Sequence, residues 1–306
     1  MNTSPVFIGG LDRSGKTYMR FMLDGHPKFA ISKRTNLWPN FYNRFGDLVN
    51  DRNLDRCFEA MTNYKHIRSL ELDLQHIRRE FESGPRTYGR LFALIHEHYA
   101  SRLGKSRWGD QSEMLEEYSS QILAAYPDAK IIHMIRDPRD RHEAIVKKSP
   151  RRGGVGVTTA RWLYSAALAE QNQKRYLGQY KVVRYETMVS YPEETMRRVC
   201  EFIDEQYHPA MIKMEDVSRF TKIITDREDE LPSPLNTAYI GRFKDNLPAC
   251  EIVFIQKHSK HLMELFDYPL EQIRCTLSEY ARFYTIHWAV YFLFVFGWRL
   301  RNKAVH

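Results

Sequence analysis

The chain has 306 residues, of which 43% are hydrophobic and 27% charged, ordinary values for a globular protein. A chain of this length buries a sufficient core without a metal or disulfide, and its composition excludes a disordered, collagen-like or multi-span membrane protein. Its 46 Lys and Arg outnumber its 38 Asp and Glu, which gives a net charge of +8. This surplus favours an anionic ligand.

The four cysteines (Cys57, Cys200, Cys250 and Cys275) are far apart, with no C-x-x-C pair among them. We interpret them as core thiols in a reducing compartment, with neither a zinc site nor a disulfide framework. A strand-like run begins at Pro5, so the first residues do not form the charged and apolar regions of a signal peptide. We therefore expect a cytoplasmic location.

Short apolar runs alternate with helical patterns along the chain, which predicts an α/β fold with a mostly parallel sheet flanked by helices. The predicted strands are 6–8, 28–32, 107–110, 130–135 and 181–185, and the predicted helices are 15–24, 51–82, 86–103, 112–125, 157–178, 193–205 and 249–266. Residues 225–248 are expected to form a long loop. We expect one domain over 1–271, followed by a C-terminal helical extension over 272–306.

The segment from Gly10 to Thr17, GLDRSGKT, matches the phosphate-binding pattern G-x-x-x-x-G-K-[ST] at every position. It follows a predicted strand and opens a predicted helix, as the pattern requires. Backbone N–H groups in such a turn bind anions, and the helix N-terminus adds partial positive charge. Arg13 and Lys16 add cationic donors, so we expect a phosphate-type anion here.

One interpretation of this loop is an ATP-dependent kinase, because thymidylate-kinase loops resemble it closely. That chemistry uses Mg²⁺, commonly held by the loop Thr and by an acidic residue that ends a second strand. Here the best second strand, 130–135, ends in Arg136. Asp137 and Asp140 follow, but they are interleaved with arginines and suit ion pairs better. The kinase is therefore the alternative function.

Four motifs in order extend the pattern beyond the loop. They are VFIGGLDRSGKT with LDGHP at 23–27, IIHMIRDPRD at 131–140, VRYE with YPEET at 183–195, and YIGRFK at 239–244. Together they resemble the sulfotransferases that use 3′-phosphoadenosine 5′-phosphosulfate (PAPS), over roughly residues 5–268. The resemblance implies a P-loop-type parallel sheet and sulfuryl transfer from PAPS, with no metal ion.

The resemblance also implies roles for individual residues. Arg13 would bridge to the leaving phosphate, and the residues implied around the 5′-phosphate are Asp12, Arg13, Ser14, Gly15, Lys16 and Thr17. Arg136 would bind the 3′-phosphate within a second basic cradle, 136–152, and Arg242 lies in the late loop that closes on the co-substrate. Ala144 stands where the family carries a serine that donates to the 3′-phosphate. In-line sulfuryl transfer, like phosphoryl transfer, would depend on positioning and on stabilisation by the catalytic cations Arg13 and Lys16.

The general base is not evident from these motifs, because Arg34 stands about where many relatives carry a Glu. The carboxylates that could take the proton of an acceptor are Asp47, Asp110 and Glu113. We expect the acceptor to be a hydroxyl, or less readily an amine, of a carbohydrate, lipid or small molecule, with peptide tyrosine still open. No nucleic-acid partner is expected. A non-catalytic nucleotide-binding or membrane-scaffolding protein is a third class.

The run Phe283–Trp298 contains no charged residue and is followed by Arg299, Arg301 and Lys303. As a helix it would span about 24 Å, short of the ~30 Å hydrocarbon core of a bilayer. We expect either attachment to a membrane surface, which would make the protein peripheral, or a buried packing helix or homo-oligomer contact.

Overall fold

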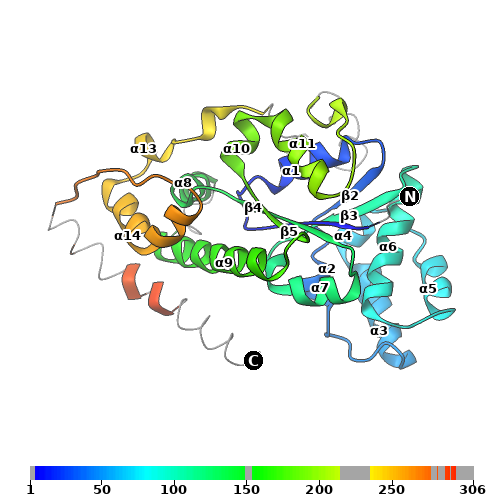
Figure 1. The fold of residues 1–306 in the computed structure, drawn as a ribbon. Coiled ribbons are helices and arrows are strands. Elements are labelled where there is room, and N and C mark those ends of the chain that lie inside the picture. Colours follow the sequence, from blue (N-terminus) through cyan, green and yellow to red (C-terminus); the bar gives the residue numbers. More distant parts are fainter. Residues whose placement is uncertain are drawn as a thin grey trace.

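The computed structural model describes residues 4–148, 154–213 and 235–276, together with 281, 287–289 and 291–293. Its centre is a sheet of five parallel strands in the order β2-β3-β1-β4-β5 (Figure 1). The strands are β1 (Val6–Gly9), β2 (Phe29–Lys33), β3 (Arg107–Gln111), β4 (Lys130–Ile135) and β5 (Tyr180–Arg184). The predicted parallel α/β sheet is confirmed.

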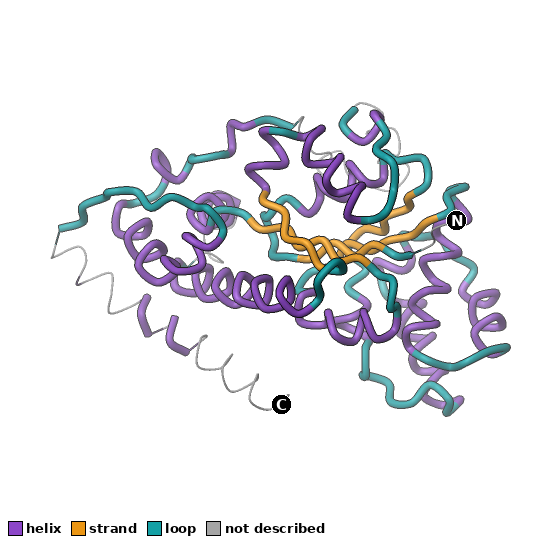
Figure 2. Tube along the Cα trace, viewed as in Figure 1, coloured by secondary structure: helices purple, strands orange, loops and turns teal. Residues whose placement is uncertain are grey.

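Helices cover both faces of the sheet, as the tube in Figure 2 shows. One face carries α1 (Lys16–Asp24), α10 (Tyr185–Ser190) and α11 (Pro192–Phe202), and the other carries α7 (Ser119–Ala125) and α9 (Val155–Arg175). The remaining helices are α2 (Leu37–Phe41), α3 (Asp51–Asn63), α4 (Lys65–Arg68), α5 (Leu74–Glu82), α6 (Tyr88–Arg102), α8 (Pro138–Lys148), α13 (Phe243–Asn246) and α14 (Ala249–Leu265). Short 3₁₀ turns are Leu115–Tyr118, Pro209–Met211 and Thr237–Tyr239.

The period-2 alternation of the central strands supplies two separate cores. In β1, Val6 and Ile8 pack against α1, α10 and α11, whereas Phe7 joins the cluster beneath α6 and α7. All three side chains are fully buried. A parallel strand covered on both faces needs apolar residues throughout, which is why its sequence reads as a continuous hydrophobic run. These two cores fix the sheet, and with it the edge where the strands end.

Two predicted helices are divided in the structure. The helix expected over 51–82 is interrupted after Asn63 and again before α5, where Asp73 caps the new helix by accepting from the backbone N–H groups of Gln75 and His76. The helix expected over 112–125 begins only at Ser119, because Met114 has a left-handed backbone with φ of 57°. A local cap and a local turn override the helical period in these cases.

The interpretation of all four cysteines as thiols is wrong for two of them. Cys250, at the start of α14, forms a disulfide with Cys275, whereas Cys57 and Cys200 are free and buried. Sequence spacing could not show this pairing, because it depends on the chain returning to α14 after 25 residues. No helix in the described ranges is long and apolar enough to span a membrane. Most of the apolar run 283–298 lies outside the described residues.

Candidate active site at the carboxyl edge of the sheet

The predicted phosphate loop lies between β1 and α1, at the carboxyl edge of the sheet. Its backbone bends through left-handed conformations at Gly10, Arg13 and Gly15, with φ of 107°, 62° and 92°. A side chain at Gly10 would collide with the backbone oxygen of Met134, and one at Gly15 would lie 2.6 Å from the ring of Tyr185. The loop therefore needs both glycines, and non-glycine strain at Arg13 is typical of a functional turn.

Lys16 is the cation of this loop that lies deepest in the protein. Its side chain is 4% exposed, and its ammonium group donates to the backbone oxygen of Gly10 at 2.5 Å. Burial lowers the pKa of Lys16 to about 8, against the attraction of Glu113 and Glu116. A buried ammonium group without an anion in direct contact is poised to bind one.

Glu116 contacts the phosphate loop and holds its backbone at Gly10. Its carboxylate accepts the N–H of Gly10 at 3.2 Å and the hydroxyl of Ser165, and only 2% of the residue is exposed. Sequence reasoning missed Glu116, because 106 residues separate it from Gly10 and no motif links the two. We assign it a positioning role, since its two oxygens are already engaged by protein donors.

Arg136 lies beside the loop, directly after β4. Its guanidinium donates to the backbone oxygens of Arg13 at 3.2 Å and Tyr239 at 2.8 Å, and it stacks on the ring of Tyr185 at 4.5 Å. Its Nε is buried and has no hydrogen-bond partner among the described residues. Buried donors are rarely left unpaired, and the Nε atoms of Arg20, Arg107 and Arg184 share this state elsewhere in the described chain, so it is the position of Arg136 beside the loop that makes it a candidate for binding an anion. Tyr185 belongs to the V-R-Y-E motif, but its sequence position alone did not reveal this stacking.

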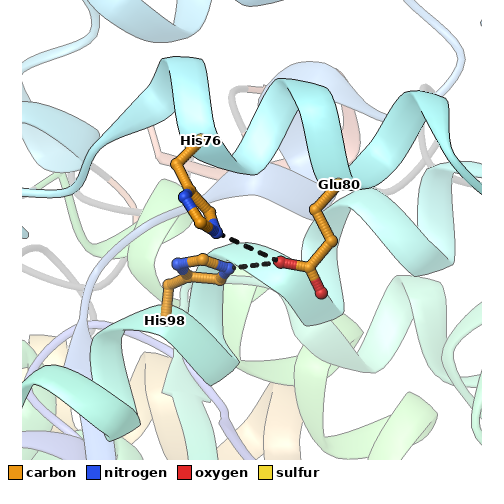
Figure 3. A group of neighbouring side chains, drawn as sticks. All are labelled: His76, Glu80 and His98. Carbon is orange, nitrogen blue, oxygen red and sulfur yellow. Dashed lines mark hydrogen bonds and ion pairs between the residues drawn. The ribbon is translucent and has the colours of Figure 1, made fainter.

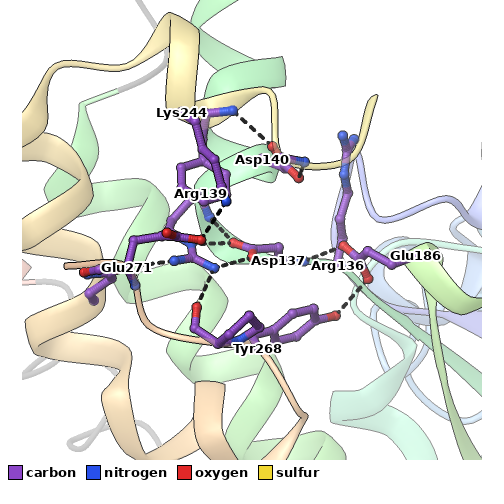
Figure 4. Close-up of polar contacts among 12 residues, drawn as sticks. Arg136, Asp137, Arg139, Asp140, Glu186, Lys244, Tyr268 and Glu271 are labelled. Atoms are coloured by element: carbon purple, nitrogen blue, oxygen red, sulfur yellow. Dashed lines mark hydrogen bonds and ion pairs between the residues drawn. The ribbon is translucent and has the colours of Figure 1, made fainter. Parts of the chain in front are cut away.

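Two arginines of the basic segment point into the protein, so the expected broad second cradle, 136–152, is wrong for Arg139 (Figure 4) and Arg141, whereas Lys147 and Lys148 are exposed. Arg139 pairs with Asp137 at 2.6 Å and Arg141 pairs with Asp12, and both arginines are 1% exposed. The carboxylate of Asp12 is therefore held by α8 rather than left free for a co-substrate. Arg141 contacts the phosphate loop through Asp12, whereas Arg136 contacts it through the backbone oxygen of Arg13.

The late loop that was expected to close on the co-substrate is anchored to α8. Asp140 accepts the N–H groups of Gly241 and Phe243 at 2.7 and 3.0 Å, which caps the start of α13. Arg242 lies between them and pairs with Glu143 at 3.3 Å. Ala144, half-buried on the same helix, offers no hydroxyl. The loop is thus held where its residue Tyr239 contacts Arg136.

The three base candidates lie in different environments, and the first two are already engaged. Asp47 is exposed and caps its own turn by accepting the N–H of Val49 at 3.0 Å. Asp110 is fully buried at the end of β3 and accepts from three hydroxyl groups, those of Ser32, Thr35 and Ser112, at 2.7–2.9 Å. Burial raises its pKa, but His96 and these hydroxyls outweigh burial, so the pKa of Asp110 is lowered.

Glu113 is the remaining candidate, two residues after Gln111. Its N–H donates to the side chain of Asn36 at 3.0 Å, and Asn36 in turn donates its N–H to Ser112 at 2.8 Å. The buried network around Asp110 therefore fixes the backbone of Glu113. Its half-buried carboxylate makes no hydrogen bond within the described part of the chain and exerts the largest attraction on Lys16. Of the three base candidates, Glu113 is the one that acts on the cations of the loop.

Comparison with known proteins agrees with this arrangement. Residues 5–209 match the model of the sulfotransferase family. The chain is 23% identical over 258 residues to a protein-tyrosine sulfotransferase of Drosophila melanogaster, covering 79% of this chain and 47% of that protein. It is also 23% identical to protein-tyrosine sulfotransferase A of Caenorhabditis elegans, covering 80% of this chain and 63% of the relative. The chain thus spans about half to two thirds of the length of these relatives.

Solved structures show the same fold. The sulfotransferase domain of the Synechococcus PCC 7002 olefin synthase superposes with a TM-score of 0.60 at 20% identity, covering 88% of this chain and 98% of that domain. The sulfotransferase domain from the curacin biosynthetic pathway gives a TM-score of 0.55 at 17% identity, covering 88% and 99%. With a family model that matches two thirds of its length and this shared fold, the chain belongs to the sulfotransferase family.

Proposed function

We propose that the protein transfers a sulfuryl group from PAPS to a hydroxyl acceptor. The observation that carries this proposal is the pair of cationic positions at one edge of the sheet. Lys16 and Arg13 lie in the phosphate loop, and Arg136 lies beside it with a buried, unpaired Nε. PAPS has a 5′-phosphosulfate and a 3′-phosphate, so two anion sites close together suit it. Open α/β sheets bind ligands at this edge.

In this proposal the loop N–H groups, Ser14, Thr17 and Lys16 surround the 5′-phosphosulfate, while Arg136 binds the 3′-phosphate. The acceptor oxygen forms a bond to sulfur as the bond from sulfur to the phosphate oxygen breaks, and the bisphosphate leaves with that electron pair. Arg13 and Lys16 stabilise the negative charge that develops on the leaving oxygen. Arg242 closes the site from the late loop. Asp12 acts indirectly, because it fixes the loop through Arg141.

The kinase alternative needs a carboxylate that can hold Mg²⁺ near Thr17. Asp137 follows the strand where such an acid is usual, but both its oxygens accept from Arg139, at 2.9 and 2.6 Å. Asp140 is likewise engaged by backbone donors. These pairings favour metal-independent transfer, as the resemblance implied.

We further propose that Glu113 accepts the proton of the acceptor hydroxyl. The backbone of Glu113 is held by Asn36 and its carboxylate attracts Lys16, while Arg34 occupies the position from which a Glu was expected. Asp110 then serves as a positioning residue for Glu113 through Ser112 and Asn36. Because the similar proteins are named protein-tyrosine sulfotransferases, a tyrosine peptide is the first acceptor to test, ahead of sugars and lipid alcohols.

The decisive experiment is calorimetric titration with adenosine 3′,5′-bisphosphate and with adenosine 5′-phosphate, each with and without EDTA. We expect the bisphosphate to bind without metal, and Arg136→Ala to weaken it by about 1.5–3 kcal/mol, the scale of a charged hydrogen bond. Adenosine 5′-phosphate should bind both proteins alike. Lys174→Ala, an exposed change on α9 outside the basic segment, is the control. Ala144→Ser should tighten the bisphosphate by a smaller amount. ATP binding that EDTA abolishes, without preference for the 3′-phosphate, would favour the kinase.

A second measurement concerns the base. Glu113→Gln keeps the shape and the backbone hydrogen bond but removes the proton acceptor, so turnover should fall by about 10²–10⁴-fold while bisphosphate affinity is kept. Asp47→Asn, in an exposed turn, should leave turnover unchanged. Turnover that survives Glu113→Gln would remove this role from Glu113 and leave the transfer proposal intact.

We also propose that the C-terminal extension, 272–306, attaches the protein to a membrane surface. Tyr291 packs on Phe254 and His258 of α14, whereas Trp288, Phe292 and Leu293 are 42%, 47% and 71% exposed. Exposed aromatic residues followed by basic ones suit an anionic bilayer surface. Deleting 280–306 should abolish co-sedimentation with anionic vesicles but leave a folded protein. Aggregation of the truncated chain would instead place the segment in a core or oligomer contact.

The Cys250–Cys275 disulfide favours an oxidising compartment over the cytoplasm.

A further inference from the structure

A group of three potential metal ligands lies on the surface of the helical region beside β2 and β3, among elements that do not form the phosphate loop. His76 and Glu80 are one turn apart on α5, and His98 approaches them from α6 (Figure 3). The Nε2 atoms of His98 and His76 lie 2.8 and 4.0 Å from the same carboxylate oxygen of Glu80. All three ligand atoms lie within 4.8 Å of one another.

The backbone that carries these side chains is fixed at both ends. At the start of α5, Asp73 accepts the N–H of His76 at 3.0 Å. At its end, the guanidinium of Arg90, from α6, donates to the backbone oxygens of Glu80 and Phe81, both at 2.6 Å. Ile77, the residue after His76, is fully buried and anchors α5 to the core. The three ligands therefore need only side-chain rotation, not a backbone shift, to converge on an ion.

We propose that His76, Glu80 and His98 bind a zinc ion that joins α5 to α6. Two imidazole nitrogens and one carboxylate oxygen form a donor set that zinc prefers, whereas Mg²⁺ and Ca²⁺ favour oxygen ligands alone. Tetrahedral zinc with bonds of about 2.0–2.2 Å places its ligand atoms roughly 3.4 Å apart. The observed 2.8 and 4.0 Å separations bracket that value.

The exposure of the ligands leaves a coordination position open to water. His76 and Glu80 are 57% and 43% exposed, and His98 is 26% exposed. The role that follows is structural, because α6 also carries His96, whose Nε2 lies 3.0 Å from the hydroxyl of Ser32 in the network around Asp110. A zinc bridge at His98 would hold the helix that completes this network. The inference does not depend on the proposed sulfuryl transfer.

The test is zinc titration of the full chain with its disulfide intact, followed by calorimetry, with Co²⁺ absorption as an independent reading of tetrahedral coordination. We expect saturable binding of one ion per chain and a zinc-dependent rise in the unfolding temperature. Losing a group that merely orients a ligand weakens metal binding about 10–100-fold, so His98→Ala and His76→Ala should each weaken zinc at least as much. His261→Ala, an exposed helical histidine on α14, should leave binding unchanged.

Two variants keep the result independent of folding. His98→Ala also removes the 2.8 Å hydrogen bond to Glu80, whereas His76→Ala removes a 4.0 Å contact with Glu80 and a ring contact with His98 on an exposed side chain, so it should fold as wild type. The reading is the difference between unfolding temperatures with and without zinc, which cancels any intrinsic loss of stability. Absence of saturable binding in wild type would overturn the proposal. Equal zinc affinity in His76→Ala, His261→Ala and wild type would overturn it too.

Discussion

The phosphate loop and the neighbouring helix α8 both bury cations, but they treat them in opposite ways. On α8, Arg139 and Arg141 are 1% exposed and each meets a carboxylate. In the loop region, Lys16 is almost as deeply buried, yet its ammonium group donates to a backbone oxygen, and Arg136 keeps a buried Nε without a partner in the described chain.

Beside the phosphate loop, this difference distinguishes the arginines that hold the framework from the cations proposed to bind the co-substrate. A buried cation with its own anion is neutralised and positions its neighbours, whereas a buried cation left without one costs stability until a ligand supplies the anion. The basic segment after β4 therefore divides into one residue for the ligand, Arg136, and two for the framework. Substitutions on α8 should therefore act on stability, and substitutions beside the phosphate loop should act on ligand binding and turnover.

The largest effect should come from breaking a framework pair. Arg139→Ala leaves Asp137 buried without its cation and also removes the donors to Gln256 and the backbone of Pro269. Removing one partner of a buried pair typically costs 3–5 kcal/mol, so the free energy of unfolding should fall by about that amount. Urea denaturation measures it. Lys147→Ala, exposed on the same helix, should change stability by less than about 0.5 kcal/mol.

Removing a cation of the proposed site should lower turnover rather than stability. Arg13→Ala and Lys16→Ala should lower turnover by about 10²–10³-fold, because each removes a donor that stabilises transition-state charge. Neither variant should lose the 3–5 kcal/mol of a broken buried pair, since no carboxylate of the described residues forms an ion pair with Arg13 or Lys16 and an uncompensated buried cation costs stability. Steady-state rates compared with urea midpoints give the two readings. Large losses of stability with unchanged turnover would assign these residues to the framework.

The affinity for the anionic co-substrate should depend on pH through the charge of Lys16. Its folded pKa of about 8 lies below the ordinary value of 10.5 because of burial. In the free protein, the charged fraction of Lys16 therefore falls as the pH rises through about 8, and anion affinity should fall with it. Lys16→Arg stays charged over this range and should flatten the profile. Calorimetric affinities between pH 7 and 9 check it.

Sequence alone predicted much of this molecule, and its failures have physical reasons. Buried parallel strands read as apolar runs, and the loop needs glycines at fixed spacing, so the sheet and the site around Gly10, Gly15 and Lys16 were predictable. The pairing of Asp12 with Arg141 and of Cys250 with Cys275 was not, because such contacts join segments far apart in the chain. The basic segment was misjudged for the same reason, since composition does not show which arginines turn inward.

The disulfide extends the framework to the C-terminal side. Residues 269–276 cross α14, where Glu271 bonds with Gln256 and Cys275 with Cys250. In the chain-entropy model, closing a loop of 25 residues stabilises the fold by about 3.5 kcal/mol. Cys250→Ala with Cys275→Ala should therefore lower the free energy of unfolding by roughly that amount or less, read by urea denaturation without reductant. The control is wild type with added reductant, which should reproduce the lower stability of the double variant. Cys57→Ala would not serve, because Cys57 is buried.

The smallest effect concerns Glu186, which links the framework to Arg136. Its carboxylate accepts the N–H of Asp137 at 2.9 Å and the hydroxyl of Tyr268 at 3.2 Å (Figure 4), and burial raises its pKa to about 7. Between its ordinary value of 4.5 and 7, the folded protein holds a proton that the unfolded chain has released. Stability contributed by that proton is complete below about pH 4.5 and is lost as the pH rises through 7.

The expected slope is below the roughly 1.4 kcal/mol per pH unit that one proton represents, since Glu186 keeps some contact with solvent. Glu186→Gln carries no titrating group and preserves the acceptor for Asp137, so its unfolding free energy should fall less than that of wild type between pH 5 and 7. Urea midpoints at half-unit intervals compare the two. Parallel curves would mean that Glu186 is ionised in the fold, and would place it with the paired charges of α8 rather than between framework and site.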